Sequence, residues 1–147
     1  YCGIGTFTLS LSKKFENIFA TENNRQSMKC LDKAIKENHI KNISKARLSA
    51  EELKDAFNGK NFNRMKDIDL NNFNFSHVLV YPPRSGLSDD VINLISEFSN
   101  IIYVSCNPKT YIEDIKKLKK HNINKIEIFD QFPNTNHMEL VSLLTSN

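Results

Sequence analysis

The chain has 147 residues and a net charge of +3, and hydrophobic and charged residues make up 39% and 25% of it. This is the balance of a globular protein, and the length predicts one domain over residues 1–147. No stretch approaches the roughly 20 apolar residues that a membrane span requires, and no signal peptide opens the chain, so we expect a cytoplasmic protein with no membrane partner. The three cysteines and four histidines are widely spaced, which predicts neither a disulfide framework nor a metal site.

The first half of the chain alternates between helical and extended patterns. It opens on a Gly3-x-Gly5 turn, and because such turns normally follow a strand, we expect the chain to start just after the first strand of its fold. Apolar spacing then predicts helices over residues 6–15 and 25–38 and strands over 17–22 and 43–48. Ser49 and Glu52 form a capping-box pattern that predicts a helix ending near Phe57. Residues 58–74 are polar and irregular.

The second half continues the alternation. We expect strands over residues 77–81, 101–105, 123–129 and 138–144, helices over 89–98 and 109–121, and a connecting segment over 130–136. At least six strands and five helices in this order predict an α/β fold, a Rossmann-like parallel sheet with helices on both faces.

The glycine turn and the acid that follows the next strand predict a ligand site. Backbone amides at Gly3 and Gly5 can approach a ligand closely, and Glu22 stands at about the spacing at which a dinucleotide-type fold binds a ribose. Both NAD and S-adenosylmethionine satisfy that pattern, so these residues alone leave the cofactor open.

Two further residues could carry chemistry. Cys106 directly follows a predicted buried strand, at the strand end where open α/β sheets bind ligands, and a thiolate there would be a strong nucleophile. Taken alone, such a cysteine is more often a small buried hydrophobe. Glu139 interrupts an apolar strand, which is costly unless the carboxylate is paired or employed, so it is a candidate general base.

Rigid loops and a basic run accompany these residues. Prolines stiffen the segment Tyr81-Pro82-Pro83-Arg84 and the segment Asn107-Pro108. Five lysines crowd one short stretch, and we interpret them as a solvated helix face, with phosphate contact as the less favoured alternative. These are Lys109, Lys116, Lys117, Lys119 and Lys120.

Four motifs in a fixed order now resemble a known family. Tyr-Cys-Gly-x-Gly from residue 1, Pro-Pro-Arg-Ser-Gly-Leu from 82, Ser-Cys-Asn-Pro from 105 and Asp-Gln-Phe-Pro-x-Thr-x-His-Met-Glu from 130 resemble the catalytic domain of the S-adenosylmethionine-dependent RNA uracil-5-methyltransferases. The resemblance spans essentially the whole chain and is strongest to the bacterial branch that makes the ribothymidine of the tRNA T-loop. It implies a class I methyltransferase sheet that lacks its first strand here, and a monomer that acts on the T-arm of tRNA without a metal.

The resemblance also implies roles for individual residues. Cys106 matches the nucleophile that adds to C6 of uracil, and Glu139 matches the base that removes the C5 proton. Arg84 and Asn107 match substrate-binding positions. The positions that match S-adenosylmethionine-binding residues are Tyr1, Gly3, Gly5, Thr6, Glu22 and Tyr81.

Two residues depart from the family pattern, which has Asp where this chain has Tyr81 and usually Asn where it has Thr6. Exchanging a carboxylate for a bulky phenol predicts weakened cofactor binding. An RNA-binding relative without activity is therefore an alternative. A nicotinamide-dependent oxidoreductase would explain neither Cys106 nor Glu139. RNA cytosine-5-methyltransferases are a nearer alternative, but they place a cysteine after the proline pair, whereas this chain has Arg84 near that position.

Overall fold

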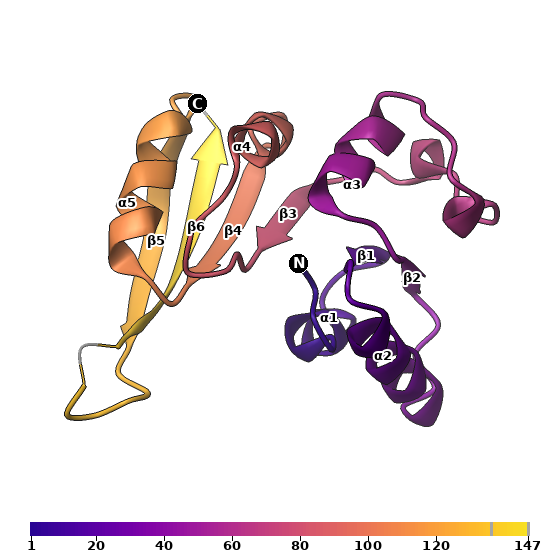
Figure 1. Cartoon of the computed structure of the whole chain (residues 1–147), viewed down its shortest axis with the longest axis horizontal. Coiled ribbons are helices and arrows are strands. Elements are labelled where there is room, and N and C mark those ends of the chain that lie inside the picture. Colours follow the sequence, from indigo (N-terminus) through magenta and orange to yellow (C-terminus); the bar gives the residue numbers. More distant parts are fainter. Residues whose placement is uncertain (136, 147) are drawn as a thin grey trace. The chain divides into compact units, whose positions relative to one another are not determined.

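A computed structural model describes residues 1–135 and 137–146 of the chain (Figure 1). The predicted alternation of helices and strands is confirmed. The elements in chain order are α1 (Thr6–Leu11), β1 (Ile18–Thr21), α2 (Arg25–Glu37), β2 (Ile43–Ala46), α3 (Ala50–Phe57), two 3-10 helices (Asn63–Met65 and Leu70–Asn72), β3 (His77–Val80), α4 (Asp89–Ile95), β4 (Asn100–Ser105), α5 (Pro108–Lys117), β5 (His121–Phe129) and β6 (Glu139–Ser146).

The chain folds into two compact units, Tyr1–Asn74 and Phe75–Asn147. Each unit has a sheet of its own, with β1 and β2 in the first and the other four strands in the second. Among the described residues, no helix is long and apolar enough to cross a membrane.

The first unit is built on the parallel pair β1 and β2, in which Ile18 is opposite Ile43. Helix α2 places Leu31 in the interior with no exposed surface. The predicted capping box starts α3, because the Ser49 hydroxyl accepts from the Glu52 N–H and the Glu52 carboxylate accepts from the Ser49 N–H. The segment predicted to be irregular adds a small core, in which Met65 clusters with Ala46 at the end of β2 and with Leu48.

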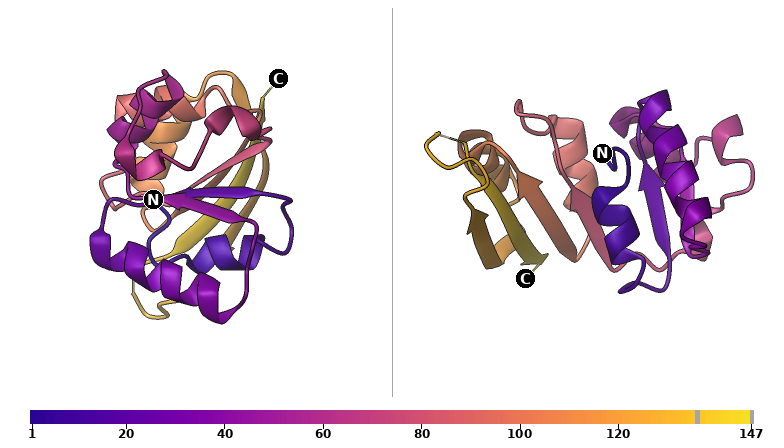
Figure 2. Two further views of the ribbon diagram at one scale, coloured as in Figure 1. Left: turned by 90° about the vertical axis from the view of Figure 1, so that its right-hand side faces the viewer. Right: turned by 90° about the horizontal axis from the view of Figure 1, so that it is seen from below.

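The second unit has the strand order β3-β4-β6-β5. Strand β3 is parallel to β4, whereas β6 is antiparallel to both β4 and β5. Helices α4 and α5 lie on the same face of this sheet (Figures 1 and 2). The buried side chains between sheet and helices include Ile101, Tyr103, Leu118, Leu140 and Leu144.

The second unit corrects two sequence-based predictions. The sheet is mixed and not wholly parallel, because β5 and β6 are joined by a short segment without a helix, and a parallel connection needs a longer crossover. The helix predicted over 109–121 ends at Lys117, and His121 instead starts β5, with its Nε2 2.7 Å from the Phe98 carbonyl. Asn136, at the end of the predicted connecting segment, lies outside the described residues.

Candidate functional site

The glycine turn of the first unit has the backbone that its sequence predicts. Gly3 and Gly5 have φ of +54° and +94°, in the region that favours glycine. The Gly5 N–H donates to the Cys2 carbonyl at 2.9 Å, and Gly5 caps α1. A Cβ at Gly5 would overlap the Leu31 side chain, whereas a Cβ at Gly3 would meet nothing within 4 Å. The turn is therefore packed against the core at Gly5 and open at Gly3.

Glu22 lies beside this turn, directly after β1. Its Oε2 accepts from the Gly3 N–H at 3.0 Å, and its Oε1 accepts from the Asn24 N–H at 2.8 Å. The Cys2 N–H donates to the carbonyl of Thr21 at 3.0 Å, which fastens the turn to the end of the strand. Each Glu22 oxygen keeps capacity for another hydrogen bond, since a carboxylate offers about four acceptor sites. The remaining two cofactor positions expected in this unit are exposed: Tyr1 and Thr6.

In the second unit, Tyr81, Cys106 and Glu139 stand at the ends of three adjacent strands. Tyr81 follows β3, Cys106 follows β4, and Glu139 starts β6. Because Leu140 of β6 is opposite Ser105 of β4, the next position along this register brings Glu139 beside Cys106. The structure thus joins two residues that lie far apart in the sequence.

Glu139 is half-buried and its carboxylate has a partner in this structure. The Tyr81 hydroxyl donates to both Glu139 oxygens, at 3.3 Å each. Burial raises the pKa of Tyr81 above its usual value, and the nearby Glu139 carboxylate and Cys106 raise it further. The phenol therefore stays protonated and acts as a donor. The carboxylate that looked costly within an apolar strand in fact sits at the strand's first residue, with a hydrogen-bond partner.

Arg84 and Asn107 also come together. The Asn107 side-chain N–H donates to the Arg84 carbonyl at 2.9 Å, while the Asn107 Oδ1 accepts from the Lys109 N–H at 3.2 Å and caps α5. The Arg84 guanidinium lies 3.1 Å from Nδ1 of His137, which must be the acceptor because arginine only donates. The ring of His137 is 6.3 Å from that of Phe132 in an edge-on contact. Arg84, His137 and Phe132 are all exposed.

Sequence reasoning missed one charged residue in this unit, Asp114. It is only 3% exposed and accepts hydrogen bonds from the Tyr103 hydroxyl and the Leu87 N–H. A signal was present, because Asp114 falls on the helical stripe that also holds Tyr111 and Leu118, both buried. A carboxylate on the apolar side of a helix predicts a buried polar contact.

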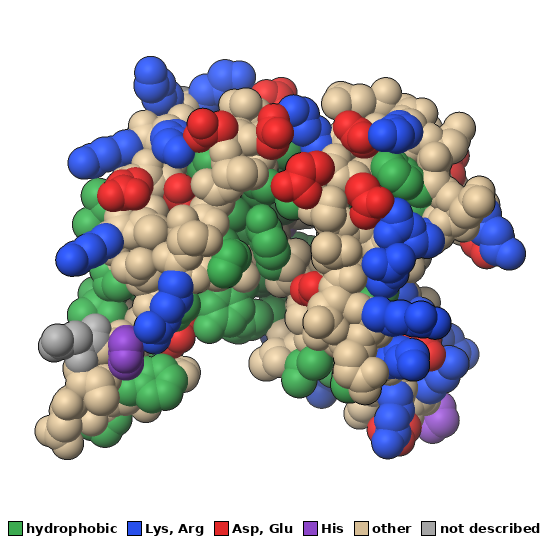
Figure 3. Space-filling model, in the orientation of Figure 1, with side chains coloured by type: hydrophobic (Ala, Val, Ile, Leu, Met, Phe, Trp, Pro, Cys, Tyr) green, Lys and Arg blue, Asp and Glu red, His purple; other side chains and the backbone are tan. Residues whose placement is uncertain are grey.

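The predicted basic run is exposed throughout, and lysine and arginine side chains stand out around α5 with acidic ones among them (Figure 3). Lys117 forms an ion pair with Asp89 at 2.7 Å, which raises the pKa of the lysine. This pairing agrees with the interpretation of the run as a solvated face.

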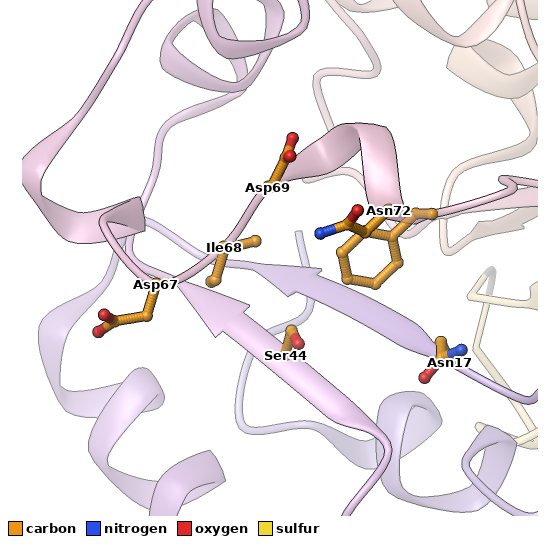
Figure 4. Close-up of a pocket in the computed structure, with 7 residues that line it drawn as sticks. Asn17, Ser44, Asp67, Ile68, Asp69 and Asn72 are labelled. Atoms are coloured by element: carbon orange, nitrogen blue, oxygen red, sulfur yellow. The ribbon is translucent and has the colours of Figure 1, made fainter.

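A shallow pocket of about 240 Å³ lies elsewhere in the first unit, at the start of β1 (Figure 4). None of the predicted site residues lines it. Its lining consists of Asn17, Ser44, Asp67, Ile68, Asp69, Asn72 and Phe73. Within residues 1–135 and 137–146 there is no group of three or more His, Cys, Asp or Glu side chains that could hold a metal ion.

Known proteins are similar to this chain over nearly its whole length. The family model described as tRNA (Uracil-5-)-methyltransferase matches residues 1–147. A tRNA/tmRNA (uracil-C(5))-methyltransferase of Campylobacter concisus is 52% identical over 146 residues, which is 98% of this chain and 40% of the relative. The protein of the same name from Saccharophagus degradans is 49% identical over 147 residues, 99% of this chain and 40% of the relative. The chain thus spans about 40% of the length of these curated relatives.

Solved structures share the fold. The Pyrococcus abyssi tRNA (uracil-54, C5)-methyltransferase in complex with S-adenosyl-L-homocysteine superimposes with a TM-score of 0.79 and 28% identity, covering 99% of this chain and 33% of that one. An rRNA methylase from Streptococcus thermophilus has a TM-score of 0.69 at 9% identity, covering 99% of this chain and 82% of that one, which is a likeness of fold alone. The predicted class I methyltransferase fold is therefore confirmed.

Proposed function

The chain belongs to the tRNA (uracil-5-)-methyltransferase family, and from that premise we propose that it carries the catalytic part of an enzyme that methylates C5 of a uridine in RNA. The substrate we propose is the T-loop uridine of tRNA, and the methyl donor is S-adenosylmethionine. We further propose that residues 1–147 act as one catalytic domain of a monomeric cytoplasmic protein. The observation that supports the proposal is that Cys106 and Glu139 each stand one position beyond the Ser105–Leu140 pair, at the ends of the adjacent strands β4 and β6.

The two side chains supply the two functions that this reaction needs. Uracil C5 is a poor nucleophile until a thiolate adds to C6, because the addition converts the ring to an enolate with electron density on C5. Cys106 is proposed to make that bond. It stands directly before Asn107, the N-cap of α5, so it lies at the N-terminal end of that helix.

After C5 has gained its methyl group, it also carries a proton that must leave. Glu139 is proposed to take this proton as a carboxylate. The electrons of the C5–H bond then re-form the C5–C6 double bond, the Cys106–C6 bond breaks, and the sulfur leaves as a thiolate. Since the base must be extruded from its stack to meet Cys106, the exposed Arg84 and the half-buried Asn107 are proposed to contact the displaced nucleotide.

The first unit has residues that suit the proposed cofactor. The open position at Gly3 leaves room for close approach to the backbone, and the Glu22 carboxylate has acceptor capacity for ribose hydroxyls. When bound, S-adenosylmethionine supplies an electrophilic methyl group on a sulfonium. The positions of this unit that are proposed to hold it are Tyr1, Gly3, Gly5, Thr6 and Glu22.

A T-arm RNA with 5-fluorouridine at the target position tests the covalent step in the intact protein. Fluorine replaces the proton that Glu139 would remove, so elimination cannot occur and the Cys106–C6 bond persists. We expect a denaturation-resistant protein–RNA adduct that forms only with S-adenosylmethionine present, detected by gel shift and mass spectrometry.

Cysteine variants make the test specific. Cys106→Ala should abolish the adduct, whereas Cys30→Ala, which alters an exposed cysteine outside the proposed site, should leave it unchanged. An adduct that survives in Cys106→Ala would refute the assigned nucleophile.

Tyr81 supports a second candidate function, RNA binding without methylation. Its hydroxyl donates hydrogen bonds to Glu139, the proposed base. Its ring also stands at the position where the family pattern has Asp. Retained T-arm binding with neither adduct nor cofactor binding would favour this second function.

A further inference from the structure

Asp114 carries a charge into the interior of the second unit. It lies on α5 and is 3% exposed, and no other Asp or Glu among residues 1–135 and 137–146 is buried. Burying a carboxylate is costly unless hydrogen bonds replace its water. The partners of Asp114 therefore indicate what the buried carboxylate does.

Those partners come from two different segments. The Tyr103 hydroxyl on β4 donates to Asp114 Oδ2 at 2.5 Å, and the Leu87 N–H, from the loop after β3, donates to the same oxygen at 2.9 Å. Tyr103 is itself fully buried and packs edge-on against Tyr111 of α5 at 5.3 Å between ring centres. One carboxylate oxygen thus joins β4, α5 and the loop that contains Arg84.

The loop lies directly on α5 around this contact. Gly86 has φ of +80°, and a Cβ there would come within 2.9 Å of Asp114 Oδ2 and 3.1 Å of the Thr110 Cβ. Earlier in the loop, the Arg84 carbonyl accepts from the Asn107 side chain at 2.9 Å and from the Thr110 hydroxyl at 3.3 Å. The loop is therefore fastened at two points, to Asp114 in the second half of α5 and to Asn107 and Thr110 at the start of the helix. Asn107 is adjacent to Cys106 in the sequence.

We propose that Asp114 is a positioning residue that holds the loop over residues 82–87 in place and thereby sets Arg84 relative to Cys106. The inference rests on the proposed function, because the position of the loop affects turnover only if Cys106 is the nucleophile. Asp114 acts on the geometry around Cys106 indirectly, through the hydrogen bond that it accepts from the Leu87 N–H. Without an acceptor, that buried N–H would be unpaired, and the loop would move away from the helix to find water.

The expected signature is a loss in turnover without a loss in binding. Misplacing a substrate-orienting group by about 1 Å can cost about 100-fold in rate, so Asp114→Ala in the intact protein should lower kcat for T-arm RNA by about that factor. The KM values for RNA and S-adenosylmethionine should stay within about threefold of the wild-type values, since the variant removes no side chain that is proposed to contact these ligands.

A conservative variant separates positioning from charge. Asp114→Asn keeps an oxygen that can accept from both Leu87 and Tyr103, so it should retain kcat within about threefold. Hydrogen exchange at the Leu87 amide, measured without RNA, should be faster in Asp114→Ala and close to wild type in Asp114→Asn. If Asp114→Ala does not fold, Tyr103→Phe serves in its place, because the Tyr103 hydroxyl orients the carboxylate oxygen that accepts from Leu87; its loss should lower kcat about fivefold at unchanged KM.

The outcomes distinguish this inference from the proposed function. If the wild-type protein forms the 5-fluorouridine adduct while Asp114→Ala has wild-type kcat, the positioning role is overturned and the proposed function stands. Equal losses of kcat in the Asn and Ala variants would also overturn it, because an acceptor oxygen alone would then not suffice. A wild-type protein that binds the RNA but forms no adduct overturns the proposed function and, with it, the role of Asp114.

Discussion

Replacing each glycine of the first turn by alanine should give two very different results. Gly3 and Gly5 both have positive φ, so each substitution has the same kind of backbone cost, about 1–2 kcal/mol for an L-residue in this region. They differ in what the new methyl group meets. At Gly3 it meets open space, whereas at Gly5 it overlaps Leu31, which has no exposed surface and cannot move aside into solvent.

The difference can be given a magnitude. Inserting a methyl group into a packed interior costs a further 1–3 kcal/mol, so we expect Gly5→Ala to lower the free energy of unfolding by about 2–5 kcal/mol and Gly3→Ala by about 1–2 kcal/mol. The order should reverse for ligand binding. If the proposed cofactor lies against the open side of the turn, the methyl group at position 3 occupies its space. Gly3→Ala should therefore lose more affinity for S-adenosylhomocysteine than Gly5→Ala does.

Urea unfolding of the intact protein, followed by circular dichroism and analysed by linear extrapolation, measures the first quantity. Titration calorimetry with S-adenosylhomocysteine measures the second. If the two variants lose stabilities that agree within about 0.5 kcal/mol, overlap with Leu31 does not add to the cost at position 5, and the steric role of Leu31 is refuted. Unchanged affinity in Gly3→Ala would refute the place of the turn in cofactor binding.

Three further results are expected. Tyr81→Asp, which restores the family residue, should raise the affinity for S-adenosylmethionine about tenfold in calorimetry, because a hydrogen bond to a charged group is worth about 1.5–3 kcal/mol; unchanged affinity would show that Tyr81 does not limit binding. The hydrogen bond from Arg64 lowers the pKa of Glu52 below its usual 4.5, so this group contributes stability above pH 4.5 that is lost as the pH falls through the lower folded-state value. Glu52→Gln should therefore make unfolding less dependent on pH in this acid range, and an unaltered pH profile in thermal melts would contradict the role of the pair. Partial burial raises the pKa of Cys2 to about 11, whereas Cys30 is exposed, so iodoacetamide at pH 8 should label Cys30 well before Cys2 in peptide mass spectra, and equal labelling would count against the raised pKa of the half-buried Cys2 thiol.

Much of the fold was predictable because local patterns are strong here. The capping box at Ser49 and Glu52 forms as predicted, since its two hydrogen bonds need only residues three apart. Cys106 follows its strand for a similar reason, because a short apolar run ended by Asn-Pro leaves little choice of structure. The end of α5 was not predictable in the same way, because the apolar spacing continues to His121 and only the pairing of β5 with β6 draws His121 into a strand.

The candidate site was predictable in its residues and less so in their contacts. Glu22 stands beside the glycine turn as its spacing suggests, and its oxygens already bind the amides of Gly3 and Asn24. The roles of Cys106 and Glu139 stay predictions. The Tyr81 contact with Glu139 could not be found from sequence, because it depends on how β3, β4 and β6 are ordered in the sheet.

The sequence by itself determined the order of the elements, the family and the candidate residues, because turns, caps, apolar spacing and the four motifs are properties of short segments. Only the tertiary structure decided that β6 lies between β4 and β5 and so brings Glu139 beside Cys106. It also decided that Asp114 is buried under the Leu87 loop. Both depend on pairings between residues far apart in the chain, where the free energy comes from burial and hydrogen bonds that no single segment contains.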